Sequence, residues 1–366
     1  MARDDRAHPA RRGPTLSALG TAKTFVADDT AAVATFLGTR PARVRVRGGG
    51  SRQLRLPEPG DATVLDLSRL TAIVRLDGPD QTCTVECGLP RADLDAALAT
   101  CGLELPCPGG GTLGGLFASD PIGASTFGGP SPRSLLLGMD AVLADGTPFK
   151  SGARVVKSVA GFDVHKLLVG SEGRLFVATR LHLRLKPAPR CVQWFCRTGL
   201  DVAAAIDCLR KLQQEPVPPA AVQLVRAPDG SCAVQGRFAG RAAFVAEMLR
   251  RHGLPESAPC WRDHLDLPTH GEVVGGATLV GALPVLSSHL PANASLLWHG
   301  GGRFEAALPD AISADAFLHT CANGGVSTLV VHGAPERRGH GTLRDDGHQR
   351  LQDGLRRALD PHGILV

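Results

Sequence analysis

The chain has 366 residues, of which 43% are hydrophobic and 20% charged, and its formal net charge is +5. This composition excludes a disordered chain, and the length exceeds what one hydrophobic core usually organises, so two domains are expected. Basic and acidic residues are mixed along the sequence, which argues against a nucleic-acid-binding protein. No run approaches the ~18 apolar residues of a membrane span, and the basic segment 1–22 lacks the apolar core of a secretory signal. We therefore expect a flexible N-terminal tail on a soluble, cytoplasmic protein.

Ten cysteines raise the question of a metal site or a disulfide framework. No two of them have the C-x-x-C spacing that is typical of zinc or iron–sulfur ligation. We therefore expect reduced, mostly buried cysteines and no metal site. If the protein transfers electrons, it must pass them on without a cluster of its own.

Short strands and helices alternate along the first half of the chain. Apolar periodicity, capping residues and turn signals locate them. A strand start followed by a helix is expected within 24–40, further helices at 90–101 and 164–169, and strands at 44–47, 63–70, 72–76, 81–87, 135–144 and 175–185.

The composition changes after Pro189, and a second region is expected there. The predicted helices are 198–214, 241–251 and 348–359, and the predicted strands are 221–225, 233–236, 296–298, 304–308 and 327–331. Strands interspersed with helices in this order predict an α+β protein.

Glycines are concentrated in four motifs of the first half. The predicted strand 44–47 runs into Gly48-Gly49-Gly50-Ser51, and three later motifs are Gly111-Thr112-Leu113-Gly114-Gly115, Val156-Lys157-Ser158-Val159-Ala160-Gly161-Phe162-Asp163 and Gly170-Ser171-Glu172-Gly173. Glycine lets a backbone adopt positive φ or approach a bulky ligand, and its unhindered N–H groups bind phosphate well. The spacing matches neither the G-x-G-x-x-G of a Rossmann fold nor the Gly-Lys-Ser/Thr ending of a P-loop. Separate turns around one cofactor predict a dinucleotide site.

In this order and spacing the motifs resemble those of the FAD-linked oxidases with the p-cresol methylhydroxylase (vanillyl-alcohol oxidase) type of flavin fold. Within that family the chain looks most like the FAD-binding subunits of bacterial glycolate oxidases. The resemblance covers essentially the whole chain and is strongest over residues 43–185. It implies a two-subdomain FAD-binding domain (23–188), a smaller α+β cap domain (189–345), and a C-terminal helix and tail (346–366) that return to the FAD-binding domain.

The resemblance also implies noncovalent FAD and its binding residues. By position in the motifs these are Arg47, Gly48, Gly49, Gly50, Ser51, Gly111, Thr112, Leu113, Gly114, Gly115, Ser119, Gly123, Gly161, Asp163, Gly170, Glu172, Gly173 and Val177.

Two residues depart from the family pattern. Asp120 stands where many members have Asn, and an acid beside a pyrophosphate would weaken binding unless it points away or pairs with Arg. Phe176 replaces a residue that is commonly small, which affects the fit of the adenosine end. Lys157 and Arg133 lie near the motifs, either as charges that neutralise the cofactor or as solvated side chains.

The catalytic residues are not identified by the sequence. Catalytic relatives carry a His-x-Gly-Asp-Gly-Asn-x-His motif in the second domain, whereas the nearest stretch here, residues 298–304, has one His and no acid. His299 and Arg303 could contact an anion, and the alternative is an ordinary glycine-rich hairpin. We expect the other histidines to be surface residues or hydrogen-bonded core residues.

The resemblance implies an FAD-binding subunit of a complex that oxidises glycolate to glyoxylate. Its implied partners are a catalytic FAD-containing subunit, an iron–sulfur subunit that passes the electrons on, and a small 2-hydroxy acid substrate. Membrane association would be peripheral at most, at the inner membrane through the complex. Two alternatives stay open: a self-sufficient FAD-dependent dehydrogenase for a 2-hydroxy acid or alcohol, and a flavin-free assembly scaffold.

Overall fold

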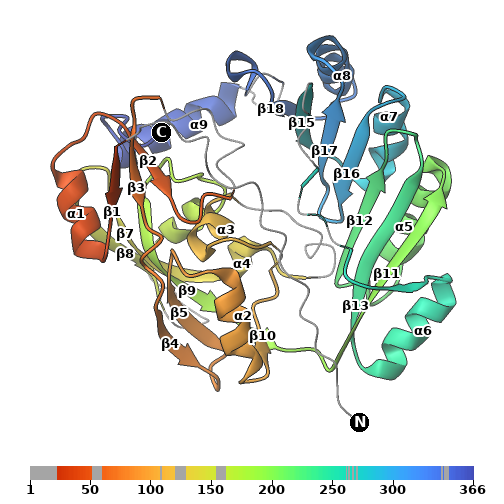
Figure 1. The fold of residues 1–366 in the computed structure, drawn as a ribbon, viewed down its shortest axis with the longest axis horizontal. Coiled ribbons are helices and arrows are strands. Elements are labelled where there is room, and N and C mark those ends of the chain that lie inside the picture. Colours follow the sequence, from red (N-terminus) through yellow and green to blue (C-terminus); the bar gives the residue numbers. More distant parts are fainter. Residues whose placement is uncertain are drawn as a thin grey trace.

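The computed structural model describes residues 23–51, 60–107, 109–119, 129–153, 162–260, 262, 264–265, 268, 271–338, 341 and 346–366. Two parts lie side by side in Figure 1, one with three small sheets and one with a single large sheet. Helices and strands are mixed in both, so the predicted α+β class is confirmed.

A three-stranded parallel sheet begins the first part, in the order β1-β3-β2. Its strands are β1 (Thr24–Val26), β2 (Val44–Arg47) and β3 (Thr63–Asp66). Helix α1 (Thr30–Gly38) covers it with Val33 and Leu37, and the carboxylate of Asp29 caps the helix by accepting from the amide of Ala32 at 2.7 Å. The strand start and helix expected within 24–40 are confirmed, with Asp29 as the N-cap of the helix.

The C-terminal residues add to the free edge of this sheet. The amide of Val44 donates to the carbonyl of Ile364 at 2.8 Å, and the amide of Val366 donates back to Val44 at 3.0 Å. Asp360 fixes the turn before this edge by accepting from the amides of Ile364 and Leu365. The C-terminus therefore lies beside β2, the strand that leads into the first glycine motif (Figure 1).

A five-stranded antiparallel sheet forms the rest of the first part, in the order β4-β5-β9-β7-β8. Its strands are β4 (Ile73–Asp77), β5 (Thr82–Glu86), β7 (Leu136–Val142), β8 (Pro148–Gly152) and β9 (Val177–Arg184). The helices of this part are α2 (Arg91–Ala99), α3 (Leu113–Ser119), α4 (Pro132–Leu135) and the 3₁₀ helix η3 (Val164–Leu168). One face of the sheet packs with α2 and α3 in a common apolar core, and the short strands β6 (Leu103–Glu104) and β10 (Lys186–Pro187) pair near the connection to the second part.

The second part is one antiparallel sheet of eight strands, in the order β14-β11-β13-β12-β16-β17-β15-β18. Its strands are β11 (Cys191–Leu200), β12 (Ala221–Arg226), β13 (Cys232–Gly240), β14 (Glu256–Ser257), β15 (Glu272–Ala277), β16 (Ser295–His299), β17 (Arg303–Leu308) and β18 (Thr328–His332). The helices that follow in this part of the chain are α5 (Val202–Gln213), α6 (Ala242–His252), η4 (Val280–Ala282), α7 (Leu283–Ser288), α8 (Ala311–Asn323), η5 (Pro335–Arg337) and α9 (Asp346–Leu359).

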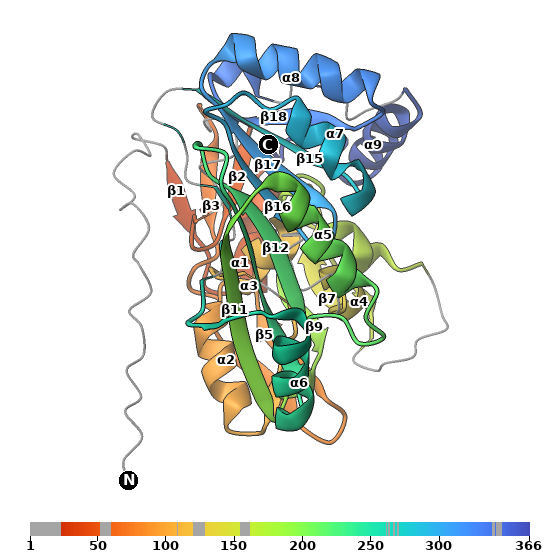
Figure 2. The same ribbon diagram turned by 90° about the vertical axis from the view of Figure 1, so that its right-hand side faces the viewer.

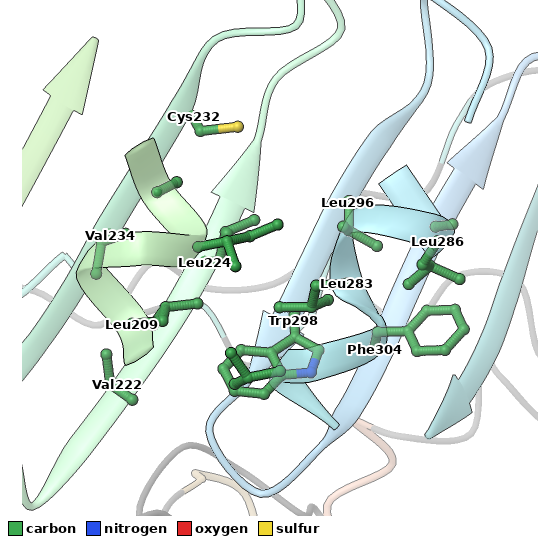
Figure 3. Close-up of a cluster of buried hydrophobic side chains, with 14 of the residues drawn as sticks. Leu209, Val222, Leu224, Cys232, Val234, Leu283, Leu286, Leu296, Trp298 and Phe304 are labelled. Atoms are coloured by element: carbon green, nitrogen blue, oxygen red, sulfur yellow. The ribbon is translucent and has the colours of Figure 1, made fainter. Parts of the chain in front are cut away.

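In the part of the chain that the structure describes, helices cover one face of the eight-stranded sheet and leave the other face without helices. In Figure 2, α5 and α6 lie in front of β11 and β12, and Figure 1 shows α5 to α8 on the side of the sheet that points away from the first part. The core between sheet and helices contains Trp298 and Phe304, which lie near Leu283 of α7 (Figure 3). The indole of Trp298 donates to the carbonyl of Thr278 at 3.1 Å, so its one polar atom is satisfied inside this core.

The predicted helix 198–214 was wrong at its start. Residues up to Leu200 belong to β11, which pairs with β13, and the helix begins at Val202 after the N-cap Asp201, whose carboxylate accepts from Ala204 at 2.7 Å. The predictions also missed β15, α7 and α8. Strand β15 contains the pair Gly275-Gly276, which has the composition of a turn.

All ten cysteines are free thiols, and most are buried. Burial raises the pKa of Cys83 to about 12, which keeps this thiol protonated and unreactive at neutral pH. Within the described ranges, no group of three or more His, Cys, Asp or Glu residues is placed to hold a metal ion. No helix in the same ranges is long and apolar enough to cross a membrane.

Candidate FAD site

The first glycine turn lies directly on Thr112, although more than sixty positions separate them in the printed sequence. A Cβ added to Gly48 would lie 2.3 Å from Thr112 Oγ1, and one added to Gly49 would lie 3.2 Å from Thr112 Cγ2. The first of these distances is well inside van der Waals contact, so a side chain at position 48 would push the turns apart. The structure therefore brings together two of the four predicted motifs.

The second motif was expected as a turn, but its residues Leu113, Gly114 and Gly115 begin helix α3, and the motif is clamped to the end of β5. The amide of Leu113 donates to Leu89 at 2.9 Å, the amide of Gly114 donates to Cys87 at 2.7 Å, and the carbonyl of Gly111 accepts from Arg91 at 2.8 Å. A Cβ on Gly114 would lie 2.8 Å from the Cβ of Cys87, so this glycine is required for the close packing of α3 on β5. These bonds fix the position of Thr112 relative to the sheet.

A third turn, residues 170–173, joins the same region. The amide of Glu172 donates to the carbonyl of Ala118 at 2.9 Å, at the C-terminal end of α3. Glu172 has φ 53° and Gly173 has φ 75°, and a Cβ on Gly173 would lie 3.3 Å from Val46 of β2. The turn thus connects the end of α3 with the strand that carries the first motif, and three of the predicted motifs converge.

Arg47, the last residue of β2, is held by an acid. Its guanidinium contacts the carboxylate of Asp66 at 2.6 Å, and Asp66 also accepts from the amide of Ser68 at 2.8 Å. Burial alone would raise the pKa of Asp66, but the hydrogen bonds from Ser68 and Arg47 outweigh it and lower the pKa below its ordinary value. The Arg47 charge is therefore largely balanced within the protein, and its predicted contact with FAD stays a prediction.

The backbone amides of the first two turns differ in their partners. Those of Leu113, Gly114 and Gly115 bond to groups of the chain, Gly115 to Thr112 Oγ1 at 3.4 Å. Among the residues that the structure describes, the amides of Gly48, Gly49, Gly50, Gly111 and Thr112 have no hydrogen-bond partner. Unhindered amides of this kind bind phosphate oxygens. These amide donors fit the pyrophosphate of FAD. An acidic side chain beside the pyrophosphate would have to come from outside these two turns.

Several predicted site residues have side chains in the apolar cores. Leu113 and Val177 are fully buried, so neither residue is accessible to a ligand, and their predicted contact with FAD stays a prediction. Phe176, the expected misfit at the adenosine end, is also buried and packs edge-on against Phe149 with ring centroids 5.5 Å apart. Its volume is therefore accommodated in the core.

The remaining predicted residues are more peripheral. Asp163 is exposed at the start of η3, and the hydroxyl of Ser119 donates to the carbonyl of Leu116 within α3. The guanidinium of Arg133 donates to the carbonyl of Lys166 at 2.9 Å. Gly123, Gly161, Asp120 and Lys157 lie outside the described residues.

The helix-free face of the eight-stranded sheet is polar and largely buried. On β12, Val222 and Leu224 point into the helix-covered core, so Gln223 between them points to the other face. There it lies opposite Gln235 of β13 and His299 of β16, and all three side chains are at most 5% exposed. His299, expected as a possible anion contact, lies 3.5 Å from Gln223 through its Nδ1.

This polar face points toward the first part of the molecule. Arg237 lies on it, stacked over Trp194 with its guanidinium carbon 5.7 Å from the ring centre. Burial raises the pKa of Glu104 in β6, and the positive charge of Arg237 is the largest of the effects that oppose it. An acid of the first part therefore lies within electrostatic reach of the polar face.

The sequence analysis missed an acid on this face by one residue. It considered residues 298–304 and found no acid, but the next residue, Glu305, is buried on the polar face at 2% exposure. A period-two reading of β17 would have found it, because Phe304 and Ala306 point into the helix-covered core.

Comparisons with known proteins identify an FAD-binding domain in the first part of the chain. A family model described as FAD binding domain matches residues 26–152, a range that includes the first two glycine turns. The fold also matches the solved structure of an alkyldihydroxyacetonephosphate synthase, with a TM-score of 0.69 and 16% identity, over 93% of this chain and 76% of that one. This likeness confirms the expected fold, a p-cresol methylhydroxylase-type FAD-binding domain followed by a second α+β region.

Two curated relatives are similar over about half of this chain. Glycolate oxidase subunit GlcE of Escherichia coli is 30% identical over 178 residues, which are 47% of this chain and 50% of the relative. The mitochondrial D-lactate dehydrogenase [cytochrome] 1 of Saccharomyces cerevisiae is 33% identical over 169 residues, 45% of this chain and 29% of the relative. The chain thus spans half or less of these relatives' length. Residues 26–152 thus form an FAD-binding domain with FAD as its cofactor, and the chain is similar to FAD-linked oxidases.

Proposed function

We propose that this chain is the FAD-binding subunit of a complex that oxidises a small 2-hydroxy acid, with glycolate as the first candidate. The observation that carries the proposal is the contact of Gly48 and Gly49 with Thr112. It gathers amides from two motifs that have no hydrogen-bond partner among the described residues. Both relatives described above are named for the oxidation of 2-hydroxy acids, and one of them is named as a subunit.

Bound FAD would supply a two-electron acceptor for the substrate. Residues 48–50, Gly111 and Thr112 would hold its pyrophosphate through backbone N–H groups. The other predicted FAD-binding residues, including Ser51, Gly170 and Gly173, would shape the rest of the cofactor site. Arg47 would act indirectly, since its bond to Asp66 orients the end of β2.

The partners belong to the same proposal. Within the described residues no cluster of ligands can hold an iron–sulfur centre, so the electrons would leave through a separate iron–sulfur subunit beside a catalytic FAD-containing subunit. We also propose that the complex works in the cytoplasm, at most peripherally at the inner membrane.

One preparation tests the proposal. The purified chain should show a flavin absorption spectrum, and glycolate with an artificial electron acceptor should give sustained turnover only when the partner subunits are added. D-lactate should be compared with glycolate, because one relative is a D-lactate dehydrogenase.

Two results would replace the proposal. Sustained turnover by the isolated chain would favour a self-sufficient FAD-dependent dehydrogenase. A colourless protein that cannot be reconstituted with FAD would favour an assembly scaffold.

A further inference from the structure

A carboxylate and an imidazole are in direct contact on the polar face of the eight-stranded sheet. Oε1 of Glu305 lies 2.9 Å from Nδ1 of His264, and Oε2 accepts from the amide of Leu265 at 3.0 Å. The side chain of Glu305 is 2% exposed, whereas that of His264 is 31% exposed. The acid is thus enclosed, and the imidazole is partly open.

Side chains of three strands hold the segment that carries His264. Gln235 of β13 donates to the carbonyl of Cys260 at 2.8 Å. Gln223 of β12 donates to the carbonyl of Arg262 at 2.9 Å and accepts from its amide at 3.0 Å. With the bond from Leu265 to Glu305 of β17, successive points of the segment are attached to β13, to its neighbour β12 and, beyond β16, to β17. The backbone that presents His264 is therefore fixed on the polar face.

The contact determines which imidazole nitrogen can act as a base. When Nδ1 carries the hydrogen and donates it to Glu305, Nε2 keeps its lone pair and can accept a proton. The buried carboxylate then stabilises the imidazolium that forms, as in other carboxylate–histidine pairs.

The pair lies on the face of the sheet that points toward the FAD-binding part, opposite the helix-covered face. On the same face, Arg237 of β13 lies within electrostatic reach of Glu104 in the FAD-binding part. In the described residues of this face, His264 is the histidine whose ring combines a carboxylate partner with partial exposure. His299, in comparison, is 3% exposed.

We infer that His264, positioned by Glu305, accepts the hydroxyl proton of the 2-hydroxy acid that reduces the FAD of this chain. The inference rests on the proposed function and adds to it a substrate half-reaction in this chain, beside that of the catalytic partner subunit. In the step, the substrate O–H bond breaks and its proton goes to Nε2 of His264. The substrate C–H bond breaks as a hydride that passes to FAD with two electrons, and the carbon–oxygen double bond of the 2-oxo acid forms.

The structural alternative is that the pair only holds the segment in place. Glu305 would do so through its bond to the Leu265 amide without any proton transfer, so a substitution of Glu305 affects both roles. Substitution of His264 distinguishes the catalytic role from the structural one, because it leaves the bond between Glu305 and the Leu265 amide available. His319 is a matched control, since it is an exposed histidine of α8 whose Nδ1 lies 3.2 Å from Asn323.

The test follows flavin reduction in the FAD-loaded chain during anaerobic mixing with glycolate or D-lactate, which requires no electron acceptor. His264→Ala should slow reduction at saturating substrate by about 100-fold or more, and added imidazole should restore part of the rate. His319→Gln should reduce at the wild-type rate. Glu305→Asp should keep more of the rate than Glu305→Gln, as expected for a positioning residue.

Binding and stability supply readouts that do not depend on activity. The thermal midpoint of His264→Ala and its affinity for oxalate, measured from the flavin spectrum, should stay close to wild type.

Equal reduction rates for wild type and His264→Ala would overturn the inference and leave the proposed function standing. A slow variant that has also lost oxalate binding, and that imidazole does not rescue, would assign the pair a structural role. A wild-type flavin that neither acid reduces would overturn the inference for this chain, and absence of turnover by the full complex would overturn the proposed function.

Discussion

The two parts of the molecule build their candidate sites in opposite ways. In the FAD-binding part, glycines shape the site, because Gly48 and Gly49 leave room for the Thr112 side chain and Gly114 leaves room for Cys87. In the second part, large polar side chains such as Gln223 and Glu305 are buried and attach a peptide segment to a sheet. The first design depends on steric space, and the second on hydrogen-bond partners. Substitutions should therefore separate cofactor binding from the stability of the second part.

The largest expected effect on stability is in the second core. Trp298→Ala would leave a cavity beneath α7, and we expect a loss of about 3–5 kcal/mol in the free energy of unfolding. FAD affinity of the folded variant should be unchanged, because the cofactor turns lie in the other part. Denaturant titration and FAD titration measure the two quantities. Leu279→Ala, at a side chain 80% exposed, is the control and should cost little.

A smaller, pH-dependent effect is expected for Asp66→Asn, which weakens the hold on Arg47. The loss of charge-assisted hydrogen bonds should cost about 1–3 kcal/mol near neutral pH. The folded pKa of Asp66 is lowered, so its stabilising effect is present above the ordinary carboxyl pKa and is lost as the pH falls through the lowered value. Unfolding curves of wild type and variant should converge in acid, and a constant difference at every pH would contradict this explanation.

The smallest effects concern helix caps, one in each part. Asp29 accepts from the amide of Ala32, and Asp310 accepts from the amide of Ser313, both at 2.7 Å. Replacement of either by Ala should cost about 1 kcal/mol, because one helix amide loses its partner. Thermal unfolding should detect both losses. A large loss at only one of them would indicate that the two parts do not unfold together.

Sequence patterns predicted the FAD-binding part better than the second part. Strand β2 and helix α1 have local signals, an alternating Val-Arg run and an Asp N-cap, and both were predicted correctly. Strands β11 and β15 have weak local signals, since their stability comes from pairing with distant strands and from packing such as that of Gly276 beneath Phe304. Helix α8 was not predicted although it has a local signal, since its N-cap residue Asp310 could be recognised in the sequence.

The candidate site likewise contains residues that local sequence patterns identified and contacts that depend on the fold. Gly48 and Thr112 were both singled out, but their direct contact depends on how β2 and β5 meet in the fold. Glu305 was missed because a motif was sought over a fixed window, whereas its position on the polar face follows from strand periodicity. The pairing of Glu305 with His264 could not be predicted, since a loop brings together residues from distant positions.

The central claim is that two glycine turns close on each other to hold FAD, and FAD titration of three variants tests it most directly. Gly48→Ala would place a Cβ 2.3 Å from Thr112 Oγ1 and should weaken FAD binding roughly 10- to 100-fold. Gly110→Ala lies in the adjoining turn with no atom within 4 Å of the added Cβ, so it should bind like wild type. Thr112→Ala combined with Gly48→Ala should recover part of the affinity, because the nearest clashing atom is removed. Equal FAD affinities for Gly48→Ala and Gly110→Ala, or a wild-type chain that binds no FAD, would contradict the claim.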